Sequence, residues 1–220
     1  MRQRAVADAR RALVLDAARS AFFELGLERA SVREIARRAG YTPGAIYSYF
    51  ASKEEMYGAL LGESLERLNA SVAAPSPVAA RRGEPAEVAV LRASANAFFG
   101  FYRENPRDLD LGFYLFQGLQ PRGLTPELNE RLNARLRDAL APAERALQRL
   151  GLEARDALAE VTALFAHTVG LLLLSHTGRI RMFHQESQAL FDRYLDALVE
   201  RVLRGAAAVL QPASRTRRAP

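Results

Sequence analysis

The 220-residue chain contains no cysteine, which excludes disulfide bridges and thiolate metal sites. Its three histidines, His167, His176 and His184, are too few and too scattered to indicate a zinc site. The most apolar run, VTALFAHTVGLLLLS, is interrupted by polar residues and is shorter than the roughly 20 apolar residues of a membrane span. The N-terminus lacks an apolar signal core with a cleavage site. We therefore expect a cytoplasmic protein without metal, cofactor or membrane partner.

Motifs of catalysis are also missing. The chain has no Gly-x-Ser-x-Gly elbow, no glycine-rich phosphate loop after a strand, and no pair of metal ligands at helical spacing. The adjacent carboxylates Glu54 and Glu55 fit the start of a helix better than acid–base chemistry. We therefore expect that the protein is not an enzyme.

Positive charge is concentrated at the two ends of the chain, whose net charge is +6. Residues 1–55 hold 10 basic and 7 acidic side chains, residues 56–211 hold 18 of each, and residues 212–220 add three arginines. A basic segment on a neutral body is typical of a nucleic-acid module joined to a separate regulatory or dimerising body. The excess in the first segment is small, so chance remains the alternative.

Signals for β-strands are absent, since the chain shows neither alternating β-branched runs nor Asn-Gly or Asp-Gly hairpins. Apolar residues recur at helical spacing instead, as in the first predicted helix with Leu15, Ala18 and Phe22 on one face. Gly26 is expected to end that helix. The pattern predicts an all-α protein whose last helix covers about residues 187–203 and whose basic tail, 212–220, is disordered.

Two short helices follow the first one. Ser31 and Glu34 form a capping box for the second helix, while Thr42 caps the third and Pro43 occupies its first position. A glycine-containing joint, AGYT, connects the two, which is typical of a helix-turn-helix motif. Any small helical bundle with short loops is the alternative. At the N-terminus, the early arginines fit either a frayed basic end or an arm that reaches flanking DNA.

The stretch AARSAFFELGLERASVREIARRAGYTPGAIYSYFASKEEMYGAL resembles the DNA-binding domain of TetR/AcrR-type transcriptional regulators. The resemblance implies a three-helix DNA-binding head with a helix-turn-helix at residues 1–55 and a helical ligand-binding and dimerisation body at 56–211. The body matches only in architecture. The residues that carry the resemblance are Phe22, Gly26, Ser31, Val32, Ile35, Ala36, Gly40, Tyr47, Tyr49, Phe50 and Lys53.

The resemblance implies that the third helix enters the major groove of a double-stranded DNA operator. Its groove side would carry Thr42, Pro43, Gly44, Ala45, Tyr47 and Ser48, with Ile46 and Phe50 on the buried side. Tyr47, Tyr49 and Lys53 would anchor phosphates, with Ser31 and Arg33 of the second helix as further contacts. The structural alternatives are core tyrosines, a lysine at a helix start, and a solvated arginine.

For the body, the resemblance implies a homodimer through the last two helices and an unidentified small-molecule effector. The expected function is a repressor that releases its operator on binding a small apolar molecule. A helical small-molecule or lipid-binding or interaction module without specific DNA binding is the alternative. Core packing is the alternative for each candidate ligand residue, and these residues are Phe98, Phe99, Tyr102, Phe113, Tyr114, Gln117, Phe165 and His167.

Overall fold

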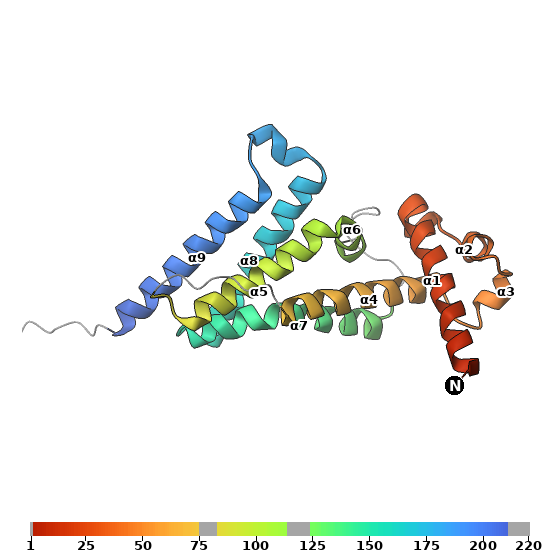
Figure 1. Ribbon diagram of the computed structural model, residues 1–220, viewed down its shortest axis with the longest axis horizontal. Helices are drawn as coiled ribbons and strands as arrows, with labels where there is room; N and C mark the ends of the chain where they lie inside the picture. Colours follow the sequence, from red (N-terminus) through yellow and green to blue (C-terminus); the bar gives the residue numbers. More distant parts are fainter. Residues whose placement is uncertain (1, 75–82, 114–123, 211–220) are drawn as a thin grey trace, which may run out of the picture. The chain divides into compact units, whose positions relative to one another are not determined.

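The computed structural model describes residues 2–74, 83–113 and 124–210, where all regular secondary structure is helical (Figure 1). The all-α prediction is therefore confirmed, whereas the predicted disordered tail lies outside the described residues. The helices are α1 (Arg2–Arg29), α2 (Val32–Ala39), α3 (Pro43–Ile46), α4 (Lys53–Ala73), α5 (Ala86–Glu104), α6 (Pro106–Phe113), α7 (Pro126–Arg149), α8 (Ala154–His176), the 3₁₀ helix η1 (Arg179–Phe183) and α9 (Ser187–Leu210).

Packing within the chain defines two compact units. The first unit comprises Met1–Asn69 and Glu104–Arg137, and the second comprises Ala70–Arg103 and Asp138–Pro220. The first unit thus contains α1, α2 and α3 together with most of α4, with α6 and with the first half of α7. The boundary predicted after residue 55 is a functional division, distinct from this division by packing, and it stays a prediction.

Helix α1 is broken near its end by Gly26, whose backbone angles are φ 77° and ψ 162°. Glycine adopts these backbone angles readily, whereas a residue with a Cβ atom is strained by them. Before the break, α1 buries one side that includes Val14, Ala18 and Phe22, while residues 4–13 are exposed. Because α1 begins at Arg2, the basic N-terminus is helical rather than frayed.

Side-chain caps define α2 and α3 as the sequence predicts. The Ser31 hydroxyl accepts from the Glu34 backbone N–H at 3.1 Å, and the Thr42 hydroxyl accepts from the Ala45 N–H at 3.3 Å. Gly40 ends α2 in the left-handed conformation, and Pro43 is the first residue of α3. Two capped helices with a tight joint confirm the helix-turn-helix motif.

The inner side of α3 is locked into the core of the first unit. Ile46 and Phe50 are 0% and 1% exposed. The guanidinium of Arg11 in α1 lies 4.5 Å from the centroid of the Phe50 ring, a cation–π contact. Phe22 meets Tyr57 of α4 edge-on, with ring centroids 6.1 Å apart. This packing fixes which side of α3 faces outward.

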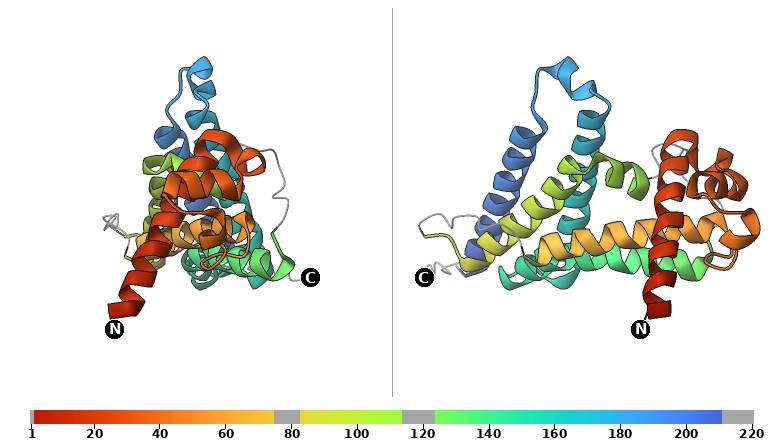
Figure 2. Two further views of the ribbon diagram at one scale, coloured as in Figure 1. Left: turned by 90° about the vertical axis from the view of Figure 1, so that its right-hand side faces the viewer. Right: turned by 45° about the vertical axis from the view of Figure 1, so that its right-hand side comes forward.

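In the second unit, α8 and α9 run in opposite directions and are joined at one end through η1 (Figure 2). The Phe99 ring of α5 stacks on Phe191 of α9 at 4.4 Å between centroids. Arg92 of α5 is buried and forms ion pairs with Asp196 of α9 and with Glu84. Aromatic stacking and a buried ion pair therefore bind α5 to α9.

Helix α8 contains the apolar run noted in the sequence and extends over 23 residues. By length and composition it can cross a membrane, since an 18-residue window has a mean hydropathy of 1.8. A single such helix is weak evidence, because core helices meet the same criterion. The expected absence of a membrane partner stays a prediction.

We predict that Gly26→Ala lowers the free energy of unfolding by about 1–3 kcal/mol, because alanine strains the backbone at φ 77°. Urea denaturation followed by circular dichroism measures the change. Gly100→Ala is the matched control: a Cβ at Gly100 in α5 meets no atom within 4 Å, so this change should stabilise by about 0.5–1 kcal/mol. Equal effects of the two substitutions would refute the strain at Gly26.

Candidate nucleic-acid interface and ligand site

The outward side of α3 and its flanking residues is exposed to solvent and consists mainly of small side chains. Thr42, Pro43 and Gly44 are exposed, and Ala45 is half-buried. A Cβ added to Gly44 would meet no atom within 4 Å, so the backbone itself is accessible there. This surface can approach the edges of bases closely, as a major-groove helix must. It is the surface that the sequence predicts for DNA contact.

The two tyrosines after α3 occupy different environments. Tyr47 is 57% exposed and its hydroxyl has no hydrogen-bond partner among the described residues, so the phenol is free to donate. Tyr49 is half-buried, and its ring lies 6.5 Å from that of Tyr41. Tyr47 therefore suits the predicted role of phosphate anchor better than Tyr49, whose ring is partly used in packing. Tyr41, in the joint between the helices, was not singled out from the sequence because ring pairing depends on the fold.

Three hydroxyl groups of the predicted interface already take part in local structure. Ser31 and Thr42 accept backbone hydrogen bonds as caps, which leaves each O–H free to donate to a phosphate oxygen. Ser48 donates to the Ala45 carbonyl at 2.6 Å, so its oxygen can only accept from an additional partner. Ser31 and Thr42 are thus better suited than Ser48 to hold a phosphate.

Two of the three arginines of α2 form ion pairs with glutamates, and one does not. Arg37 and Arg38 both hydrogen-bond to Glu34, and these bonds lower the pKa of the Glu34 carboxyl to about 2. Arg38 also pairs with Glu24 at 2.7 Å. Arg33 is exposed and has no ion pair with any described residue. Of these three cations, Arg33 is the one available to a phosphate or a base edge.

Lys53 differs from its predicted role. Its ammonium donates to the backbone carbonyls of Leu27, Glu28 and Ala30 at 2.6, 3.0 and 3.2 Å. A lysine has three donors, and all three are satisfied here inside the first unit. Lys53 therefore joins the start of α4 to the carbonyl end of α1, an arrangement that argues against direct phosphate anchoring. The sequence motif identifies Lys53 as an important residue, but the groups to which its ammonium donates are determined by the fold.

The ligand candidates Phe98 and Phe165 are brought together in the second unit, with ring centroids 5.9 Å apart. Both line a cavity of only about 10 Å³ between α5, α7 and α8. That volume is near the minimum for one water, whereas small-molecule sites measure roughly 300–1,000 Å³. The site is therefore closed in this conformation. Its other lining residues are Ser94, Ala95, Ala139, Leu140, Ala143, Leu164 and Thr168.

The remaining ligand candidates lie elsewhere or outside the described residues. Phe99 packs against α9, and Tyr102 is buried against Phe98. Phe113 is half-buried at the end of α6, in the first unit. Tyr114 and Gln117 lie outside the described residues. Phe99, Tyr102 and Phe113 do not line the closed cavity beside Phe98 and Phe165.

His167 belongs to the seam between α8 and α9 and not to the lining of that cavity. Its ring stacks on Tyr194 with centroids 4.0 Å apart. Burial lowers the pKa of His167, partly opposed by a hydrogen bond with the backbone of Leu190. Its Nε2 atom is buried and has no hydrogen-bond partner among the described residues. The geometry assigns His167 to packing between the two helices. A metal site is not apparent either: the described residues contain no cluster of three His, Asp or Glu ligands.

Comparison with known families agrees with this geometry. A family model described as bacterial regulatory proteins of the tetR family matches residues 14–60, and one described as the tetracyclin repressor-like C-terminal domain matches residues 91–198. The chain belongs to the TetR family. The TetR resemblance noted in the sequence is confirmed, and the C-terminal match extends it to the body. The exposed residues 4–13 of α1 precede the matched region.

Individual TetR relatives match chiefly in the N-terminal part. The A-factor receptor protein of Streptomyces griseus is 50% identical over 50 residues, covering 23% of this chain and 18% of that protein. The transcriptional repressor Rv1474c of Mycobacterium tuberculosis is 40% identical over 62 residues, covering 28% and 33%. The chain thus matches a third or less of the length of these relatives.

Solved structures share the TetR fold over most of the chain. The regulatory protein SCO4313 superposes with a TM-score of 0.71 at 20% identity, covering 89% of this chain and 97% of that one. The transcriptional regulator FadR of Bacillus subtilis, solved with stearoyl-CoA, has a TM-score of 0.56 at 21% identity, covering 85% of this chain and 96% of that one. At these identities the comparison shows the fold alone.

We predict that Lys53→Met lowers the free energy of unfolding by about 1–3 kcal/mol, because three carbonyls at the end of α1 lose their donor. Arg33→Met is the matched control, since it removes one exposed, unpaired charge and should change stability by less than about 0.5 kcal/mol. Urea denaturation without DNA compares the two. If Lys53→Met proves as stable as Arg33→Met, the lysine does not hold the helices together.

A second prediction concerns pH. Since the folded state lowers the pKa of His167 below its ordinary 6.5, the unfolded chain binds more protons as pH falls below that value. Stability should therefore decrease from about pH 7 to about pH 5, and His167→Phe, which keeps a ring on Tyr194, should make the decrease smaller. Melting temperatures across this range test it. An unchanged pH profile in His167→Phe, matching that of the control His176→Gln at an exposed site, would contradict the prediction.

Proposed function

We propose that the protein is a cytoplasmic, sequence-specific DNA-binding transcriptional regulator. The observation that carries the proposal is the two-sidedness of α3: Ile46 and Phe50 are buried, while Thr42, Gly44 and Tyr47 are presented outward. A short helix with a buried back and an open, sterically small front is suited to the major groove. The TetR family models, which describe regulatory proteins, support the same function.

Each residue of the outward surface has a role that its chemistry allows. Gly44 and Ala45 let the α3 backbone approach base edges. Tyr47 donates its phenol to a phosphate oxygen, and Arg33 contributes a free positive charge. Lys53 acts indirectly by holding α4 to the end of α1. Tyr49, Ser31, Thr42, Pro43 and Ser48 complete the surface, with Ser48 limited to accepting hydrogen bonds.

A homodimer through α8 and α9 would provide the second recognition helix that tight operator binding needs. On α8, Leu158 is 44% exposed, and Ala159, Ala163 and Ala166 are exposed as well. Small apolar residues on one helix allow close approach of a symmetry-related helix. This exposed side of α8 supports a dimer in which α8 meets its copy.

The effector would be a small apolar molecule bound between α5, α7 and α8, at the closed cavity lined by Phe98 and Phe165. The FadR structure with stearoyl-CoA is a precedent for a ligand with a long apolar chain in a protein of this fold. A ligand releases DNA only if it binds the DNA-incompetent conformation more tightly. Repression is the proposed mode of action, in line with the repressor among the sequence relatives.

The proposal is tested with duplexes that the wild-type protein selects from a random library. We predict that Gly44→Ala weakens binding about tenfold, since the added methyl group projects from the surface that approaches the bases. The same change should not lower the melting temperature, because the methyl group meets no protein atom within 4 Å. Fluorescence anisotropy across a salt series measures affinity, and Arg33→Gln should reduce the slope of log affinity against log salt by about 0.9.

Arg145→Gln is the control, because Arg145 is exposed on α7 in the second unit and belongs neither to the proposed DNA surface nor to the proposed dimer surface of α8. Its affinity and salt slope should equal those of the wild type. If the selection enriches no sequence, or if binding lacks salt dependence, the chain is a helical ligand-binding module rather than a regulator. Enrichment combined with normal binding by Gly44→Ala would instead move the interface away from α3.

A further inference from the structure

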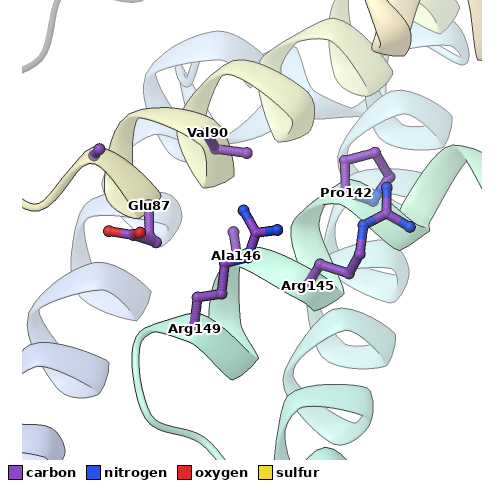
Figure 3. Close-up of a pocket in the computed structure, with 7 residues that line it drawn as sticks. Glu87, Val90, Pro142, Arg145, Ala146 and Arg149 are labelled. Carbon is purple, nitrogen blue, oxygen red and sulfur yellow. The ribbon is translucent and has the colours of Figure 1, made fainter.

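A second hollow lies on the surface of the second unit, between the start of α5 and the last turns of α7. Its volume is about 380 Å³, within the range of small-molecule sites. Ala86 and Val90 of α5 and Pro142 and Ala146 of α7 form its apolar surface. The charged lining groups are Glu87, Arg145 and Arg149, shown in Figure 3.

The two arginines of this surface hollow stand one helical turn apart on α7. Figure 3 shows both guanidinium groups directed toward the side of the hollow formed by Val90 and Pro142, whereas the Glu87 carboxylate points away from them. Neither arginine forms an ion pair with a described residue. Two like charges four residues apart destabilise a helix by roughly 0.2–0.5 kcal/mol. Arg149 in the last turn of α7 complements the helix dipole, but this does not account for Arg145.

Some arginines of the second unit are paired: Arg92 is held by Asp196, and Arg201 forms a bidentate pair with Glu160. Others, such as Arg155 and Arg193, are exposed without an ion pair among the described residues. Arg145 and Arg149 differ from both groups because they line a concave surface without a described carboxylate partner. Guanidinium groups bind carboxylates and phosphates through two parallel hydrogen bonds, which makes an anion the complementary ligand.

The apolar side of the hollow defines the rest of the ligand. Val90 is a large hydrophobic side chain that is 46% exposed, and it lies across from Pro142; the Arg149 guanidinium is near Val90, and the Arg145 guanidinium is near Pro142. We propose that the hollow binds a small anionic amphiphile, with its carboxylate or phosphate group between Arg145 and Arg149 and its apolar part on Val90 and Pro142.

This site is separate from the closed cavity proposed for the effector. On α5 the cavity is lined by Ser94, Ala95 and Phe98, whereas the hollow is lined by the earlier turns from Ala86 to Val90; on α7 the hollow is lined by Pro142 and by the turns after Ala143. The two sites share no lining residue. The inference is also independent of DNA binding and can hold or fail without it.

Isothermal titration calorimetry of the full chain with decanoate, decanol and inorganic phosphate tests the proposal. We predict that decanoate binds, and that decanol and inorganic phosphate each bind at least tenfold more weakly, because each lacks one half of the ligand. In the double variant Arg145→Gln/Arg149→Gln, the affinity for decanoate should fall at least tenfold. Val90→Glu, which adds a carboxylate beside the arginines, should reduce it similarly.

The matched control is Arg155→Gln/Arg193→Gln, which removes two exposed arginines from α8 and α9 and lowers the net charge equally. It should bind decanoate like the wild type. Circular dichroism melts establish that every variant is folded. Unchanged decanoate binding in the Arg145/Arg149 variant would place the ligand elsewhere and overturn the proposal. An equal loss of decanoate affinity in the control would also overturn it. If inorganic phosphate binds as tightly as decanoate, the ligand needs no apolar part and is not an amphiphile.

Discussion

The proposed DNA surface depends on how Lys53 joins two helix ends. Its ammonium satisfies the carbonyls of Leu27, Glu28 and Ala30, directly after the break that Gly26 introduces in α1. Because α2 and α3 lie in the chain between these two ends, the bond closes a loop around the whole helix-turn-helix. The outward surface of α3 is therefore held from behind, by a cation that itself needs no contact with DNA.

Local chemistry explains which parts of the head were predictable. Ser31, Gly40, Thr42 and Pro43 act within one helical turn, so the sequence predicts their caps and helix ends directly, and the structure agrees. The direction of the Lys53 side chain depends on a segment more than twenty residues away, which no local pattern encodes. The structure shows a contact of Lys53 within the protein, and the phosphate contact stays a prediction.

The body was less predictable, because one aromatic residue at helical spacing looks like another. Phe98 and Phe99 are neighbours in sequence, yet the first lines the closed cavity and the second stacks on Phe191 of α9. His167 was grouped with the ligand residues, but it packs on Tyr194 at the seam of α8 and α9. Helix periodicity identifies which residues are inside, whereas the partner of each residue follows only from the arrangement of the helices.

The near absence of empty space beside Phe98 and Phe165 has a kinetic meaning. A ligand can enter this cavity only when α5, α7 and α8 move apart. The rate of this opening therefore limits the rate of ligand binding. The apparent dissociation constant also rises in inverse proportion to the open fraction, by about a hundredfold if one molecule in a hundred is open. Such a receptor would respond slowly and would ignore brief fluctuations in the concentration of its ligand.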